Sequence, residues 1–125
     1  MPEQSELICV LDDDASVRNS IEHLLDSDML KAHSFENAEE FLMYASSHEV
    51  SLVVLDVWMP NTSGLKVQLQ LHEVSPDTKV IVMTGRETPT IRAAALEGGA
   101  FAFLLKPFDD EAFLALVRQA LGSVA

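Results

Sequence analysis

The sequence predicts an α/β fold in which a parallel five-stranded sheet is covered by helices on both faces. Short apolar runs typical of β-strands alternate five times with segments in which apolar residues recur at helical spacing. Several of these runs are apolar at every position, which is typical of strands buried on both faces of a parallel sheet. Five such βα units most often wind in the strand order 2-1-3-4-5.

The first unit begins with residues 7–11, which are all apolar, and three aspartates end this strand. A helix is expected over residues 15–26, and Asp14 is expected to cap it. The second strand is expected at residues 29–33. The apolar stripe of the first helix consists of Val17, Ile21, Leu24 and Leu25.

The second helix is expected over residues 37–44, where Asn37 can act as N-cap and Glu40 stands three positions later, as in a capping box. The third strand, residues 52–55, is apolar throughout and ends at Asp56. The alternation of strands and helices therefore continues through the second helix and the third strand.

The third helix is expected over residues 65–72, after turn residues at 60–64. A fourth strand at residues 80–83 precedes a helix over residues 90–97, which two glycines end in the manner of a left-handed cap. The final unit is a strand at residues 101–105 and a helix over residues 109–121, with two acids in its first turn that suit the helix dipole.

Charge and composition argue against several classes of function. Eight basic and twenty acidic residues give a net charge of −12, which disfavours direct binding to nucleic acid or to a membrane surface. No apolar run approaches the ~20 residues of a membrane helix, and the first residues lack the features of a signal peptide. The single cysteine, Cys9, cannot form an intrachain disulfide, which fits a reducing compartment. We expect one cytoplasmic domain over residues 1–125.

Polar residues stand where four of the expected strands end. Asp12 and Asp13 follow the first strand, Asp56 the third, Thr84 the fourth and Lys106 the fifth. Because the carboxyl ends of parallel strands meet at one edge of the sheet, these side chains are expected to converge there.

Three carboxylates and one ammonium give this edge a charge of −2. Two carboxylates ~5 Å apart repel each other by ~3 kcal/mol at an effective dielectric constant of ~20, and a divalent cation would balance the charge. Carboxylate oxygens suit a hard ion such as Mg²⁺. A carboxylate beside Mg²⁺ and a lysine can attack phosphorus to form an aspartyl-phosphate, and the Thr84 hydroxyl can bond a phosphoryl oxygen.

These residues carry a resemblance to a known family. Asp12-Asp13, residues 56–60 with Gly64, Thr84-Gly85 and residues 106–108 together resemble the receiver domain of two-component response regulators. The resemblance covers roughly residues 6–121 and is greatest to receivers that precede a LuxR-type helix-turn-helix output domain. It implies a flavodoxin-like, doubly wound three-layer sandwich of five βα units.

The resemblance also implies a role for each residue of the strand-end cluster. Asp56 would accept a phosphoryl group from the phosphohistidine of a sensor histidine kinase. Asp13 and Asp56 would ligate Mg²⁺ directly, together with the backbone carbonyl of Trp58, and Asp12 would help through water. Lys106 would pair with the phosphoryl group, or with Asp56 before its arrival.

Thr84 and Phe103 are the implied switch residues. Thr84 would move toward the phosphoryl oxygen, and the aromatic ring of Phe103 would turn inward. The surface of the fourth helix, fifth strand and fifth helix would then change, and it is where such receivers form homodimers or hold an output domain. The resemblance further implies a cis Lys106–Pro107 bond.

Three positions depart from the family's usual pattern or flank the site. Met29 stands where receivers usually have glycine, and because methionine resists a left-handed cap, the turn is expected to differ in shape. Trp58 and Arg86 flank the predicted site, and their size and charge should alter access to it.

The two alternatives to a phosphoaccepting signalling domain are a phosphohydrolase and a pseudo-receiver. A Mg²⁺-dependent phosphohydrolase with an aspartate nucleophile usually has a second acid two residues later, where this chain has Trp58. A phosphorylation-independent pseudo-receiver would lack some of the five key residues. Since an output domain is absent, the chain is expected to be either a free receiver or part of a longer regulator.

Overall fold

Five parallel strands form one sheet in the order β2-β1-β3-β4-β5, in a computed structural model that describes residues 7–86 and 88–122. The predicted α/β class and strand order are confirmed. The strands are β1 (Ile8–Leu11), β2 (Ala32–Phe35), β3 (Leu52–Asp56), β4 (Lys79–Thr84) and β5 (Ala102–Leu105). The helices are α1 (Ala15–Ser27), α2 (Ala38–Ser47), α3 (Gly64–Val74), α4 (Pro89–Glu97) and α5 (Asp110–Ala120).

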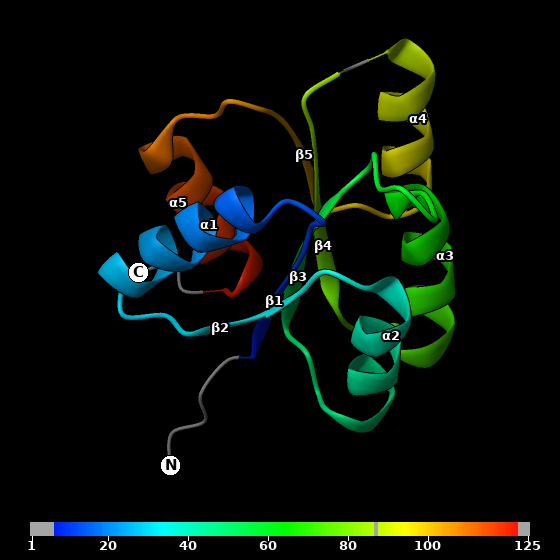
Figure 1. Cartoon of the computed structure of the whole chain (residues 1–125), viewed down its shortest axis with the longest axis horizontal. Coiled ribbons are helices and arrows are strands. Elements are labelled where there is room, and N and C mark those ends of the chain that lie inside the picture. The colour runs from blue at the N-terminus through cyan, green and yellow to red at the C-terminus, as the bar shows by residue number, and fades with distance from the viewer. Residues whose placement is uncertain (1–6, 87, 123–125) are drawn as a thin grey trace.

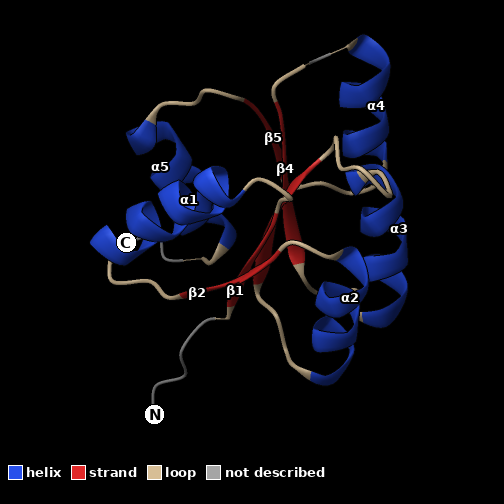
Figure 2. Ribbon diagram, in the orientation of Figure 1, coloured by secondary structure: helices blue, strands red, loops and turns tan. Residues whose placement is uncertain are grey.

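The sheet is the middle of three layers. Helices α1 and α5 lie on one face, and α2, α3 and α4 lie on the other (Figures 1 and 2). Successive residues of a strand point to opposite faces, so Ile8 and Val10 of β1 pack in the α1/α5 layer, whereas Cys9 and Leu11 pack in the opposite layer. All four residues of β1 are fully buried, which explains its uninterrupted apolar sequence.

The helix ends use the predicted side chains. The Asp14 carboxylate accepts a hydrogen bond from the Ser16 backbone N–H, and the Asn37 side chain accepts one from the Glu40 N–H. Gly99 follows α4 with a φ of +94°, as expected for a left-handed cap. Among the helices of the described residues, none combines the length and the apolar character that a membrane span requires.

The turn after α1 corrects two predictions. Strand β2 begins at residue 32 instead of 29, and Met29 adopts the left-handed conformation, with a φ of +62°, that its side chain was expected to resist. The N–H groups of Met29 and Leu30 donate to the carbonyls of Asp26 and Leu25, both at 2.9 Å. These bonds close the end of α1 despite the side chain, so residues 28–30 belong to the turn and the strand starts later.

Substituting Met29 by glycine is therefore expected to stabilise the fold. The left-handed conformation costs an L-residue about 1–2 kcal/mol, which glycine would avoid. Glycine loses more conformational entropy on folding, and this offsets about 0.5–1 kcal/mol of the gain. Because the Met29 side chain is 91% exposed, little packing is lost. We expect Met29→Gly to raise the free energy of unfolding by about 0.5–1 kcal/mol, measured by urea denaturation. Met29→Ala keeps the strain and is the control; equal midpoints for the two variants would contradict the explanation.

Candidate functional site

Strands β1 and β3 place three carboxylates beside one another. Asp12 and Asp13 directly follow β1, and Asp56 is the last residue of β3. One carboxylate oxygen from each lies within 4.8 Å of the others. Asp12 and Asp56 are only 1% and 4% exposed, whereas Asp13 faces solvent. The structure thus brings together the three acids that the sequence placed at separate strand ends.

Lys106, just after β5, reaches into this cluster. Its Nζ lies 3.0 Å from Asp56 Oδ1 and 3.1 Å from Asp12 Oδ2. The Lys106 backbone N–H donates to the Thr84 carbonyl at 2.8 Å, which fixes the start of the loop, and the Lys106–Pro107 peptide is cis. One ammonium therefore bridges the two buried carboxylates.

Arg18 is a neighbour of the site that the sequence did not reveal. Its Nη1 donates to the Asp12 backbone carbonyl at 2.7 Å, and its Nη2 lies 3.7 Å from the Glu36 carboxylate. The Asp14 N–H also donates to Asp12 Oδ1 at 2.9 Å, so the loop that carries Asp12 and Asp13 is held from two sides. The one available signal was the position of Arg18, one helical turn after the Asp14 cap.

Gly64 lets α3 begin directly against the end of β3. A Cβ atom at this position would lie 2.2 Å from the Asp56 backbone oxygen, far inside any contact distance. The Gly64 N–H donates to the Val57 carbonyl at 2.9 Å, and Ser63 caps the helix. Absence of a side chain is thus required for the close approach that sets the backbone of Asp56.

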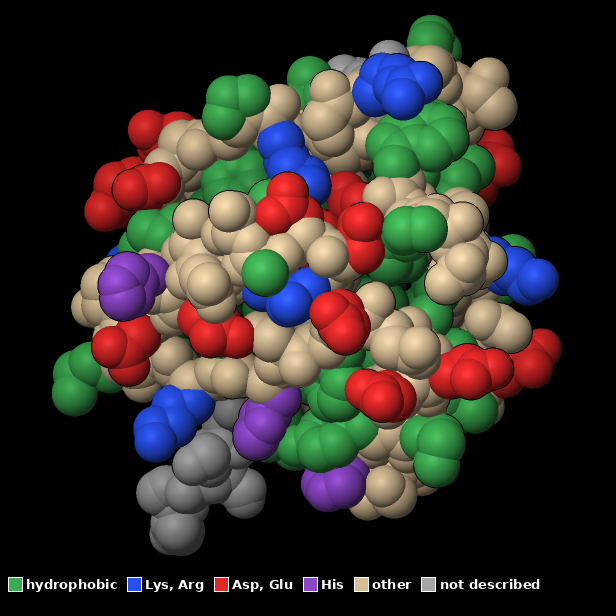
Figure 3. Space-filling view, in the orientation of Figure 1, with side chains coloured by type: hydrophobic (Ala, Val, Ile, Leu, Met, Phe, Trp, Pro, Cys, Tyr) green, Lys and Arg blue, Asp and Glu red, His purple; other side chains and the backbone are tan. Residues whose placement is uncertain are grey.

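The site carries excess negative charge. Figure 3 shows acidic side chains gathered in the upper middle of one face, beside a basic side chain and between the two helical layers. Burial raises the pKa of Asp56; the Lys106 hydrogen bond opposes this, and the charges of Asp12 and Asp13 add to it. Burial would lower the pKa of Lys106, but its bonds to Asp56 and Asp12 outweigh burial and raise it.

Because the pKa of Asp56 is raised, Asp56→Asn is expected to stabilise the fold by an amount that depends on pH. A folded state that holds the proton more tightly than the unfolded state loses stability as the carboxyl ionises. The loss begins near the unfolded pKa of about 4 and is complete above the folded pKa. We expect Asp56→Asn to be more stable than the parent at pH 7–8, and the difference to vanish in acid, in urea titrations without divalent cations. A difference that does not change with pH would contradict this account.

Thr84 ends β4 and is completely buried. Its hydroxyl donates to the Arg86 carbonyl at 3.0 Å and accepts from the Arg86 N–H at 3.1 Å. Trp58, two residues after Asp56, donates its indole N–H to the same carbonyl at 3.3 Å. The Arg86 guanidinium carbon lies 5.0 Å from the centroid of the Trp58 ring. Trp58 and Arg86, which are expected to flank the site, therefore contact each other.

Phe103 occupies the middle of β5, opposite Val82 of β4. It is half-buried and packs against the core under α2, α3 and α4, with the Arg92 guanidinium carbon 5.2 Å from its ring centroid. Since Thr84 pairs with Leu105, Phe103 lies two residues further from the carboxyl ends of the strands than Thr84 does.

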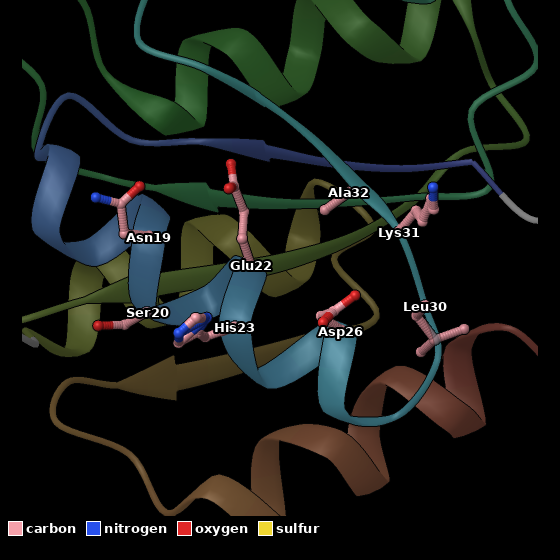
Figure 4. A pocket seen from close by; sticks show the side chains of 8 residues that line it. All are labelled: Asn19, Ser20, Glu22, His23, Asp26, Leu30, Lys31 and Ala32. Atoms are coloured by element: carbon pink, nitrogen blue, oxygen red, sulfur yellow. The ribbon is translucent and has the colours of Figure 1, made fainter.

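Two of the hollows outside the carboxylate cluster border α1. One, of about 650 Å³, runs along α1 beside the chain that enters β2, and Figure 4 shows Asn19, Glu22 and Asp26 along its helical side. Glu22 accepts a hydrogen bond from Ser34 of the edge strand β2, so this acid has a structural contact. The other hollow, of about 420 Å³, is mainly apolar and adjoins Lys106; Val17, Ile21, Leu24, Pro107 and Phe108 are among its lining residues.

Comparison with known proteins identifies the relatives of this chain. The family model of the response regulator receiver domain matches residues 8–118. The transcriptional regulatory protein FixJ of Azorhizobium caulinodans is 40% identical over the whole chain, which covers 59% of FixJ. TdiR of Thauera aromatica, also a transcriptional regulatory protein, is 40% identical over 92% of the chain and 51% of TdiR. The chain thus spans about half the length of these curated relatives.

Solved structures give the same result for the fold. The beryllofluoride-activated NtrC4 receiver domain dimer superposes with a TM-score of 0.88 at 31% identity, over 94% of this chain and 97% of that one. The beryllofluoride-activated DrrB receiver domain superposes with a TM-score of 0.85 at 29% identity, over 95% and 99%.

Proposed function

The chain belongs to the response regulator receiver domain family, and on that premise we propose that Asp56 accepts a phosphoryl group from a phosphohistidine of a sensor kinase. The observation that carries the proposal is the position of Asp56. Its carboxylate is almost buried at a strand end, held by Lys106 at 3.0 Å and crowded by Asp12 and Asp13. Such a group gains most from a reaction that disperses its charge.

The transfer forms one bond and breaks one. A carboxylate oxygen of Asp56 attacks phosphorus, the nitrogen–phosphorus bond of the phosphohistidine breaks, and its electron pair returns to the imidazole. The Lys106 ammonium lies beside Asp56 Oδ1 and can stabilise the charge that develops on the phosphoryl oxygens. We propose that attack by water on the same phosphorus, catalysed by the same residues, reverses the modification.

Mg²⁺ fits the donors that the site offers. Three carboxylates within 4.8 Å of one another are hard oxygen ligands, and Lys106 alone cannot neutralise them. We propose that Asp13 and Asp56 hold the ion with the Trp58 carbonyl, and that Asp12 helps through water. When bound, the ion would neutralise carboxylate and phosphoryl charge. The Arg18 and Asp14 bonds keep the Asp12–Asp13 loop in position for it.

Magnesium is expected to stabilise the chain and to permit a beryllofluoride response. At a Mg²⁺ concentration tenfold above its Kd, the free energy of unfolding should rise by about 1.4 kcal/mol. Beryllofluoride added with Mg²⁺ should change the fluorescence of Trp58, the single tryptophan. Asp13→Ala should largely abolish both effects, while Asp77→Asn, an exposed acid in the turn before β4, should retain them. A full response in Asp13→Ala would count against the assigned ligands.

The apolar hollow beside Lys106 is the surface we propose for the kinase. Val17, Ile21 and Leu24 of α1 line one side, and Pro107 and Phe108 line the other. A phosphohistidine must approach Asp56 from solvent, so a partner helix seated in this groove would present its imidazole close to Lys106. We propose a sensor histidine kinase as this partner and a cytoplasmic location for the encounter.

Phosphorylation is proposed to switch the surface formed by α4, β5 and α5. Thr84 gains a phosphoryl partner only in the active conformer, and Phe103, now under Arg92, turns inward as Thr84 moves. We propose that this surface forms a receiver homodimer or holds an output domain, and that a longer protein controls transcription in this way. We also propose a single receiver domain over residues 1–125; residues 1–6, 87 and 123–125 of that range lie outside those described.

A further inference from the structure

The backbone carbonyl of Arg86 accepts hydrogen bonds from two side chains, one at the end of β4 and one in the loop that follows β3. Thr84 donates its hydroxyl to this oxygen at 3.0 Å, and Trp58 donates its indole N–H at 3.3 Å. A carbonyl oxygen has two lone pairs, so both are used. The Arg86 guanidinium also lies 5.0 Å from the centroid of the Trp58 ring. We call these Trp58–Arg86 contacts the indole clasp.

The clasp acts on the residue that must move. A threonine hydroxyl has a single proton, so Thr84 cannot donate to the Arg86 carbonyl and to a phosphoryl oxygen at once. The Arg86 N–H also donates back to Thr84 at 3.1 Å, so the Arg86 peptide holds the hydroxyl from both sides. An indole that fixes this peptide therefore opposes the release of Thr84.

We propose that Trp58 is a positioning residue that holds the Arg86 peptide and so favours the resting orientation of the Thr84 hydroxyl. The proposal rests on the proposed function, because it supplies the regulation of that same site. Trp58 itself is 45% exposed, so its N–H can bond water when the Arg86 carbonyl moves away. The clasp is therefore a modest bias that phosphorylation can overcome.

Trp58→Phe tests the proposal because it removes the indole N–H and keeps an aromatic, though smaller, ring at this position. The Thr84 rotamer populations are measured by NMR three-bond couplings without Mg²⁺, and beryllofluoride affinity with Mg²⁺ by calorimetry. We expect a larger population of Thr84 rotamers in which the hydroxyl has left the Arg86 carbonyl. We also expect the apparent affinity for beryllofluoride to be about two- to tenfold higher, the equivalent of one hydrogen bond.

Two further variants separate the clasp from general effects. Tyr44→Phe also removes a polar hydrogen from an aromatic residue, but on α2, and should leave both measurements unchanged. Arg86→Gln keeps the backbone carbonyl and weakens only the ring contact, so its effect should be smaller than that of Trp58→Phe.

The outcomes distinguish the clasp from the proposed function. If the parent shows no Mg²⁺-dependent beryllofluoride binding, the proposed function fails whatever Trp58 does. If the parent binds but Trp58→Phe matches it in couplings and affinity, the clasp is wrong. A lower affinity in Trp58→Phe would also overturn it, because Trp58 would then support the activated form.

Discussion

Asp56→Asn is expected to take up no phosphoryl group from acetyl phosphate or from a phosphorylated histidine kinase. The amide has nearly the shape of the carboxylate but lacks its nucleophilic oxygen, so the bond to phosphorus cannot form. The fold should persist, since Asp56 ionised and buried is a source of instability. The loss of phosphorylation is measured by intact-mass spectrometry and by gel electrophoresis that separates phosphorylated from unphosphorylated chains.

The control for this result is Asp77→Asn, which removes an exposed carboxylate in the turn before β4. It should be labelled at the parent's rate. Labelling of Asp56→Asn at that same rate would show that Asp12, Asp13 or another residue accepts the phosphoryl group, and the proposed function would need a different acceptor.

Lys106→Met is expected to slow phosphorylation by acetyl phosphate by about 10²–10³-fold, the range for removing one preorganised donor from a developing anion. The change removes the ammonium that lies 3.0 Å from Asp56 and 3.1 Å from Asp12, while methionine keeps most of the side-chain volume. The two buried carboxylates would then face each other without a counter-charge, so some loss of stability is also expected.

Rates must therefore be compared among folded samples, checked by circular dichroism. Lys79→Met removes an exposed lysine at the start of β4 and should behave as the parent. Lys106→Arg retains the charge and should recover part of the rate. Parent-like labelling of Lys106→Met would exclude Lys106 from the chemistry and leave it a structural role only.

The strand-end cluster could be predicted from sequence because its geometry follows from the topology. Once the strands are parallel and their order is known, Asp12, Asp56, Thr84 and Lys106 must end at one edge of the sheet. No further detail of side-chain packing is needed. The same reasoning explains why the apolar runs of β1 and β3 were assigned correctly, since strands buried on both faces leave the clearest pattern.

Contacts that involve the loops could not be predicted in this way. The bond from Arg18 to the Asp12 carbonyl and the Trp58–Arg86 contact depend on loop conformations that no periodicity encodes. Strand β2 was placed too early because Met29 and Leu30 are apolar like a strand, yet their N–H groups close the end of α1. Its exposed edge position, with His33 facing solvent, leaves little alternation to correct the error.

The buried thiol of Cys9 makes the chain convenient for site-selective labelling. Cys9 is 0% exposed in the middle of the sheet, and burial raises its pKa to about 12. At neutral pH almost no thiolate is present, and reagents such as maleimides cannot reach the sulfur. A cysteine introduced on the outer side of α4 would thus react alone. Spin labels or fluorophores attached there could report distances across a phosphorylation cycle while the native residue stays in place.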